Sequence, residues 1–186
     1  MAPEPTRFHR RTLLLGALGL PACAGARAAG DPAAGEVSWA TVVLVRHAEK
    51  ESAGEDPDLS EAGVARSEAL SRLLQNSAPS HLFSSEYLRT RRTLAPLEQA
   101  TGLEPLIHPA RDAAGQAARL RALPPGSLAV LCGHSNTLPQ ILATLGAPLA
   151  RLDPKGHIEE STYHRLFILT LLPPSSPALL ELRYDP

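Results

Sequence analysis

The chain has 186 residues, of which 44% are hydrophobic and 20% are charged, and its formal net charge is -1. This composition is typical of one soluble globular domain built around a single core. A near-neutral chain offers no strongly basic surface, and its few aromatic residues are not interleaved with Lys and Arg. We therefore expect no nucleic-acid partner.

The first 28 residues have the pattern of a signal peptide. Arg10 and Arg11 precede an apolar run at residues 13–20, and small residues follow up to Ala28. The run is shorter than the roughly 20 residues that span a bilayer, so we expect no transmembrane helix in the mature protein. This pattern predicts a signal peptide at residues 1–28, a flexible linker at 29–40 and one domain at 41–186, exported to the periplasm.

The export route has two further readings. Arg10-Arg11 followed by Thr12-Leu13-Leu14 resembles a twin-arginine signal. Leu20-Pro21-Ala22-Cys23 resembles a degraded lipobox, in which Cys23 would carry a lipid anchor, although Pro21 weakens the match. An unprocessed leader on an internal protein is the remaining alternative. Without the leader, Cys132 has no disulfide partner, and its position in an apolar run predicts a buried small side chain.

The domain begins with a continuous β-branched run at residues 41–45, which is typical of a strand buried on both faces of a parallel sheet. Ser60 is the predicted N-cap of a helix that starts at Glu61, where apolar residues recur at helical spacing. The later elements follow in chain order: a strand at 81–84, a helix at 86–100 capped by Ser85, a strand at 103–107, a helix at 113–122, a strand at 128–132, a helix at 137–145, and a hairpin of 163–171 with 178–184.

Strands that alternate with helices predict a three-layer α/β/α fold with a mostly parallel central sheet, and the final hairpin predicts an antiparallel edge. In such sheets, ligands bind at the carboxyl ends of the strands. Arg46 and His47 directly follow the first strand, and His134 follows the strand at 128–132. Arg89 stands in the first turn of its predicted helix, near the same edge of the sheet.

Two imidazoles and two guanidiniums that converge on one point predict a site for phosphate. Arginine gives forked, charge-assisted hydrogen bonds to phosphate oxygens, and helix N-termini add positive dipole. An imidazole held beside the phosphate can attack phosphorus, while the arginines stabilise charge on the equatorial oxygens during transfer.

The motifs that carry this site resemble the histidine phosphatase superfamily, the phosphoglycerate-mutase-like family. They are Arg46-His47-Ala48-Glu49, Asp58-Leu59-Ser60 with Gly63, Ser85 with Arg89 and Thr93, and Gly133-His134-Ser135-Asn136. The match spans residues 42 to about 146, in the family's order, and continues weakly to residue 167.

The resemblance implies a role for each matching residue. His47 is expected to accept the phosphoryl group, Arg46 and Arg89 to bind it, and His134 to hydrogen-bond it opposite the nucleophile. Asn136 is expected either to cap its helix or to add a donor. The resemblance implies no cofactor, and the sequence contains no Cys or His pair with zinc-like spacing, so we expect no metal.

Two positions depart from or extend the family pattern. Ala48 stands where the family more often has Gly, so its backbone must avoid positive φ or tolerate it at some cost. Many members supply the leaving-group proton from a carboxylate between the second Arg and the second His, whereas the small phosphohistidine phosphatases lack it. Asp112 is the best-placed candidate general acid in this chain, and Glu49 lies so close to His47 that we expect it to orient the site.

These observations predict a small phosphatase that works through a phosphohistidine intermediate on His47. Its partner would be a phosphorylated small molecule or a phosphoprotein. Two alternatives remain: a phosphoglycerate-mutase-like phosphoryl transferase, and a non-catalytic phosphate-binding lipoprotein. The short domain, which leaves little room for inserted segments, favours hydrolysis over isomerisation.

Overall fold

The computed structural model describes residues 39–172 and 175–186. The predicted signal peptide, the lipidation site at Cys23 and residues 29–38 of the predicted linker lie outside this part of the chain. The first strand begins at Ala40, one residue before the predicted start of the domain. In the described ranges, the helices are too short or too polar to cross a membrane.

One six-stranded sheet forms the centre of the domain, with the strand order β3-β2-β4-β1-β5-β6. The first four strands in this order are parallel to one another, and β5 and β6 are antiparallel additions beside β1. Their bounds are β1 Ala40–Arg46, β2 His81–Ser85, β3 Leu106–His108, β4 Leu128–Gly133, β5 Arg165–Leu171 and β6 Ala178–Arg183. The predicted mostly parallel sheet with an antiparallel edge is confirmed.

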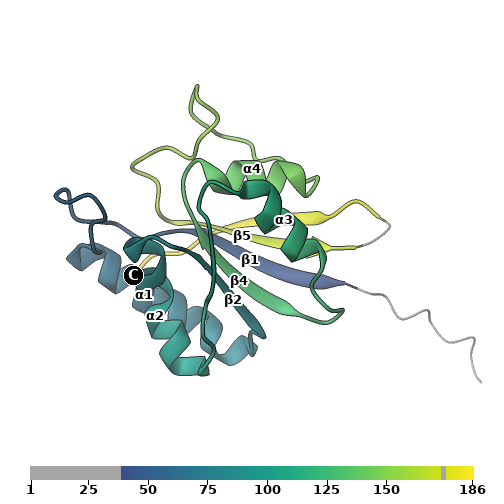
Figure 1. The fold of residues 1–186 in the computed structure, drawn as a ribbon, viewed down its shortest axis with the longest axis horizontal. Coiled ribbons are helices and arrows are strands. Elements are labelled where there is room, and N and C mark those ends of the chain that lie inside the picture. Colours follow the sequence, from purple (N-terminus) through teal and green to yellow (C-terminus); the bar gives the residue numbers. More distant parts are fainter. Residues whose placement is uncertain (1–38, 173–174) are drawn as a thin grey trace, which may run out of the picture. The chain divides into compact units, whose positions relative to one another are not determined.

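The α-helices of the described residues cover both faces of this sheet, with α1 and α2 on one face and α3 and α4 on the other (Figure 1). Their bounds are α1 Glu61–Leu74, α2 Leu88–Thr101, α3 Ala113–Arg121 and α4 Thr137–Thr144, and a short 3-10 turn, η1, covers Gln75–Ser77. Strand β1 alternates between the two cores: Val43 and Val45 pack with α1 and α2, and Val42 and Leu44 pack with α3 and α4. The predicted three-layer arrangement is therefore confirmed.

The start of α2 differs from the prediction. Ser85 is the last residue of β2 and not the N-cap of this helix; its hydroxyl accepts from the N–H of Tyr87 at 3.3 Å and also contacts Thr90 and His134. The first helical residue, Leu88, donates its backbone N–H to both carboxylate oxygens of Asp56, at 3.1 and 2.9 Å. A residue 32 positions earlier in the chain thus takes the capping role, which local sequence cannot show.

Helix α1 lies directly against the backbone that follows His47. Ser60 caps this helix as predicted, because its hydroxyl accepts from the N–H of Gly63 at 3.3 Å. A Cβ atom on Gly63 would lie only 2.0 Å from the carbonyl oxygen of Glu49. Gly63 is therefore needed for close approach between the helix and the loop that carries the first histidine motif.

We predict that Gly63→Ala destabilises the protein by about 1–3 kcal/mol, because the added methyl group overpacks against rigid backbone. In an unobstructed helix the same change would stabilise by about 0.5–1 kcal/mol, so the sign of the effect is the test. Urea unfolding gives the free energy of unfolding for both chains, with Glu68→Ala on the exposed face of α1 as control. A more stable Gly63→Ala variant would contradict the contact.

Candidate active site

Parallel pairing of β1 with β4 brings the two predicted histidines together. Arg46 lies opposite Gly133 in this register, so His47 and His134 each follow a paired strand end. The backbone N–H of His47 donates to the carbonyl of Gly133 at 2.9 Å. The imidazole centroids are 5.4 Å apart, and the two residues are only 4% and 7% exposed.

The ring of His47 is held in one tautomer by its own loop. Nδ1 lies 2.8 Å from the carbonyl oxygen of Ala48, and a carbonyl can only accept, so Nδ1 carries the proton and Nε2 carries the lone pair. The N–H of Ala48 in turn donates to the hydroxyl of Thr93 at 2.9 Å. Ala48 is not one of the described residues with positive φ, so alanine fits at this position without strain.

Both imidazoles are neutral at physiological pH. The pKa of His47 is lowered to about 3, mainly by burial and also by the charge of nearby Arg46, although the bond to the Ala48 carbonyl acts in the opposite direction. Burial also lowers the pKa of His134 to about 4, with Arg89 as the next cause. A neutral His47 with a free Nε2 lone pair is the form that can act as a nucleophile.

Arg46 is 2% exposed, and its side chain packs against a loop that precedes β5. Its Nη1 donates to three carbonyl oxygens of this loop, at 3.0, 2.8 and 3.2 Å, those of Glu159, Glu160 and Thr162. Its Nη2 lies 3.1 Å from the carboxylate of Glu160, and its guanidinium lies 4.2 Å from the ring centroid of Tyr163. The Nε–H of Arg46 is buried and has no partner.

Arg89 also pairs with a carboxylate and lies against a tyrosine ring. Its Nη1 lies 3.3 Å from the carboxylate of Asp56, and its guanidinium lies 4.2 Å from the ring centroid of Tyr87. Its Nε–H is likewise buried without a partner. A buried donor without an acceptor is costly, so Arg46 and Arg89 each present a donor suited to an anion.

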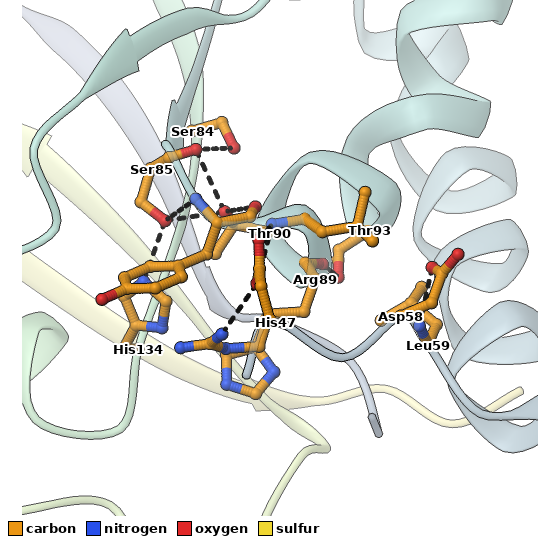
Figure 2. A network of polar contacts seen from close by, with 12 residues as sticks. His47, Asp58, Leu59, Ser84, Ser85, Arg89, Thr90, Thr93 and His134 are labelled. Atoms are coloured by element: carbon orange, nitrogen blue, oxygen red, sulfur yellow. Dashed lines mark hydrogen bonds and ion pairs between the residues drawn. The ribbon is translucent and has the colours of Figure 1, made fainter. Parts of the chain in front are cut away.

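A chain of hydroxyl groups orients His134. Its Nε2 lies 2.9 Å from the hydroxyl of Ser85, which lies 2.7 Å from the hydroxyl of Thr90 (Figure 2). The backbone N–H of His134 donates to the hydroxyl of Thr137 at 3.1 Å. When Ser85 donates to Nε2, the Nδ1–H of His134 is the ring's remaining donor. Ser85 therefore links β2 and the start of α2 to the second histidine.

These side chains line one cavity of about 340 Å³, at the lower end of the range for ligand pockets. The lining residues are Arg46, His47, Lys50, Tyr87, Arg89, Ala110, Arg111, His134, Ser135, Asn136, Thr137 and Glu160. Asn136 occupies the N-cap position of α4 but makes no side-chain capping bond. The Asn136 amide therefore borders the cavity, and it does not make the helix-capping hydrogen bond that was one of the two expected roles.

The carboxylates near the site have different surroundings. Asp112 accepts from the N–H of Gly115 at 2.8 Å as the N-cap of α3, and it does not line the cavity. Glu49 forms a bidentate ion pair with Arg66, with both oxygens within 3.0 Å of Nε, as an orienting role requires. Glu160 is the one carboxylate among the described residues that line the cavity.

Sequence reasoning missed several residues of this site, namely Lys50, Asp56, Tyr87, Arg111, Glu160 and Tyr163. Tyr87 stands two positions before Arg89 inside a recognised motif, so its place was within reach of the sequence. The loop that contains Glu160 and Tyr163 has no such signal, because only the fold brings it to Arg46, more than 100 positions away.

In the part of the chain that the structure describes, we find neither a metal-binding site nor a reactive cysteine. No group of three or more His, Cys, Asp or Glu side chains in these residues has the arrangement to hold a metal ion. Cys132 is buried in β4, and burial raises the pKa of its thiol, so it does not serve as a nucleophile.

We predict that His47 lowers stability in acid. Its pKa is about 3 in the folded protein and about 6.5 for an unperturbed histidine, so between these pH values the unfolded chain binds a proton that the folded chain does not. The free energy of unfolding should therefore fall as pH falls through this window, and His47→Gln should reduce the slope. Urea unfolding at several pH values measures this slope. A midpoint near 6.5 for His47 in an NMR titration of the folded protein would contradict it.

A family model described as the histidine phosphatase superfamily, branch 1, matches residues 42–113. No curated protein matches the sequence. The family match supports a phosphatase or phosphoryl-transfer function, in a superfamily that also includes mutases.

Solved structures match about three quarters of the chain. A structure of the protein histidine phosphatase SixA with tungstate has a TM-score of 0.61 at 16% identity, over 77% of this chain and 96% of that one. A SixA structure from Agrobacterium tumefaciens has a TM-score of 0.55 at 21% identity, over 76% and 97%. The phosphoglycerate mutase from Plasmodium falciparum has a TM-score of 0.54 at 16% identity, over 78% and 91%. The resemblance predicted from the motifs is confirmed: the chain carries the pattern of the histidine phosphatase superfamily at residues 42–113, on a phosphoglycerate-mutase-like fold.

Proposed function

We propose that the protein is an exported phosphatase that hydrolyses phosphate monoesters or phosphohistidine through a phosphohistidine intermediate on His47. One observation carries the proposal: two buried guanidinium Nε–H donors without partners, on Arg46 and Arg89, beside a neutral imidazole with a fixed tautomer. The family match supports phosphoryl chemistry, and the pattern of residues 1–28 supports export.

Binding of the phosphoryl group uses the four predicted residues together. Arg46 and Arg89 give the charge-assisted donors that the phosphate oxygens accept, and their tyrosine and backbone contacts fix both guanidiniums in advance. His134 donates a further hydrogen bond from the opposite side, with its ring oriented by Ser85. Asn136 stands at the N-terminus of α4, where its amide and the helix dipole favour an anion.

Transfer then follows from the tautomer of His47. Nε2 attacks phosphorus, the P–N bond forms, and the P–O bond to the alcohol breaks while the alcohol takes a proton. The Nδ1–H bond to the carbonyl of Ala48 stabilises the positive charge that the ring acquires. Water next attacks phosphorus and gives a proton to the group that protonated the alcohol, the P–N bond breaks, and His47 returns to its neutral form as inorganic phosphate leaves. In both steps, Arg46 and Arg89 stabilise charge on the equatorial oxygens.

Replacing the nucleophile tests the proposal directly. We expect His47→Ala to lower kcat on p-nitrophenyl phosphate by at least about 10³-fold, because the covalent route is lost. The wild type should form an acid-labile, base-stable phosphoenzyme that His47→Ala lacks, and EDTA should leave turnover unchanged. His81→Ala, outside the cavity, is the matched control.

Two results would overturn this function. Equal turnover by wild type and His47→Ala would contradict the enzyme hypothesis and would leave a non-catalytic phosphate-binding protein as the alternative. Isomerisation of 3-phosphoglycerate in the presence of its bisphosphate primer, faster than phosphate release, would identify a mutase instead.

The proton donor is tested separately, by the choice of leaving group. We propose Asp112 for this role, as the sequence predicts, and its carboxylate would have to leave its bond to Gly115. Asp112→Asn should slow hydrolysis of alkyl phosphates by about 10²-fold or more and spare p-nitrophenyl phosphate, whose leaving group needs no proton. Glu160→Gln is the comparison variant, because Glu160 lines the cavity. The same pattern in Glu160→Gln alone would reassign the role.

A further inference from the structure

Strand β6 forms one edge of the sheet, and part of its backbone points away from the sheet. Where the ladder with β5 continues, the N–H of Tyr184 donates to the carbonyl of His164 at 2.9 Å, so these two residues form a hydrogen-bonded pair. Hydrogen-bonded and non-hydrogen-bonded pairs alternate along an antiparallel ladder. Leu182 therefore points its N–H and C=O toward β5, whereas Glu181 and Arg183 point theirs toward the free edge.

This edge lacks the features that usually protect a free strand. Proteins protect edge strands by keeping them short or by placing proline or inward-pointing charges on them. The opposite edge strand, β3, has 3 residues and is followed directly by Pro109. Strand β6 has 6 residues, contains no proline, and pairs with β5 along its whole length. It is therefore the edge that is better suited to backbone pairing with another strand.

One face of β6 is apolar and largely uncovered. Leu180 and Leu182 are 53% and 42% exposed. Their neighbours in β5, Ile168 and Leu166, belong to the core beneath α1 and α2, so the two leucines lie on that face of the sheet. A cavity of about 560 Å³ opens beside Leu182, and it is also lined by Leu73 of α1, which is 55% exposed. Apolar side chains from a partner would find apolar surface here.

The other face of β6 carries charges that are not balanced within one chain. Arg183 lies directly opposite Arg165 in the ladder with β5, and like charges in this position are destabilising. Arg165 donates to both carboxylate oxygens of Glu181, at 2.9 and 3.1 Å, which fixes this carboxylate. In residues 39–172 and 175–186, Arg183 has no carboxylate within ion-pairing distance. A carboxylate placed across the free edge would supply the missing partner.

We propose that β6 pairs with β6 of a second copy of this chain, antiparallel about a two-fold axis at Leu182. In this register, Glu181 of each copy lies opposite Arg183 of the other, and these residues point their free backbone groups at each other. Leu182 then lies opposite its own copy, and Leu180 lies opposite Tyr184, beside the apolar cavity. Registers centred on Glu181 or Arg183 would place like charges opposite each other. The second copy thus satisfies the backbone, the leucines and the charges together.

The interface goes beyond the proposed hydrolysis and does not depend on it, so its test needs no substrate. Sedimentation velocity over a concentration series measures the association of the purified chain. We expect a reversible change from the mass of one chain to that of two, and Leu182→Lys should weaken this association by at least about 10-fold, because two like charges would lie opposite each other at the axis.

The matched control places the same charge on the other edge of the sheet. Ile107 lies in β3 and is 50% exposed, so Ile107→Lys should associate like the wild type. Circular dichroism and urea unfolding check that both variants are folded. A wild type that stays monomeric would overturn the interface, and so would a dimer that is lost in Ile107→Lys but kept in Leu182→Lys.

Disulfide formation tests the register itself. The two copies of residue 182 would form a non-hydrogen-bonded pair with Cα atoms about 4.5 Å apart, which suits a disulfide. The two copies of residue 180 would be offset by about 13 Å along the strands, too far for a bond. We therefore expect Leu182→Cys to cross-link at least about 10-fold faster than Leu180→Cys under mild oxidation. Both variants keep Cys23 and Cys132, so these cysteines cannot cause a difference. Equal cross-linking would overturn the proposed pairing.

Discussion

The pairing of β1 with β4 is the constraint on which the rest of the site depends. Because the two strands are parallel and Arg46 lies opposite Gly133, their ends meet at one edge and deliver both histidines to one point. The backbone bond from His47 to Gly133 continues the ladder by one residue beyond the strand. A shift in this register would separate the imidazoles and turn their side chains to opposite faces of the sheet.

Holding two guanidiniums, of which that of Arg46 is buried, beside two buried imidazoles has an electrostatic cost that the surrounding structure offsets. Arg46 donates to three loop carbonyls and pairs with one carboxylate, Arg89 pairs with Asp56, and a tyrosine ring lies against each guanidinium. These contacts leave each Nε–H unpaired. Burial is the main cause that lowers the pKa values of both histidines, and the positive charge of the arginines acts in the same direction. The guanidiniums that favour phosphate therefore also help to keep the nucleophile neutral.

The helices contribute to the site mainly by positioning its loops. Helix α1 approaches the Glu49 carbonyl through Gly63, and α2 holds Ala48 through the hydroxyl of Thr93. The buried pair of Arg66 with Glu49 joins the same loop to the C-terminal segment, because Arg66 also donates to the carbonyl of Tyr184. Residues that belong to one sequence pattern thus make separate contacts with the loop that follows His47, and each contact helps to position its ring.

The sequence by itself determined the layered fold and the main members of the site. Continuous β-branched runs are typical of buried parallel strands, and strand ends in such sheets share one edge, so the meeting of Arg46, His47, Arg89 and His134 follows from local pattern and a topological rule. The N-cap at Ser60 was equally local, because the capping bond to Gly63 spans three residues.

Only the tertiary structure decided the contacts between distant segments. Asp56, and not Ser85, accepts from the first backbone N–H of α2, and the loop around Glu160 contacts Arg46. These residues are far apart in the sequence, so the tertiary fold and not local propensity brings their atoms together. The same holds for the cavity lining, where Lys50 and Arg111 follow β1 and β3, strands that lie three places apart in the sheet. Their charges are visible in the sequence, but only the strand order brings them to one cavity.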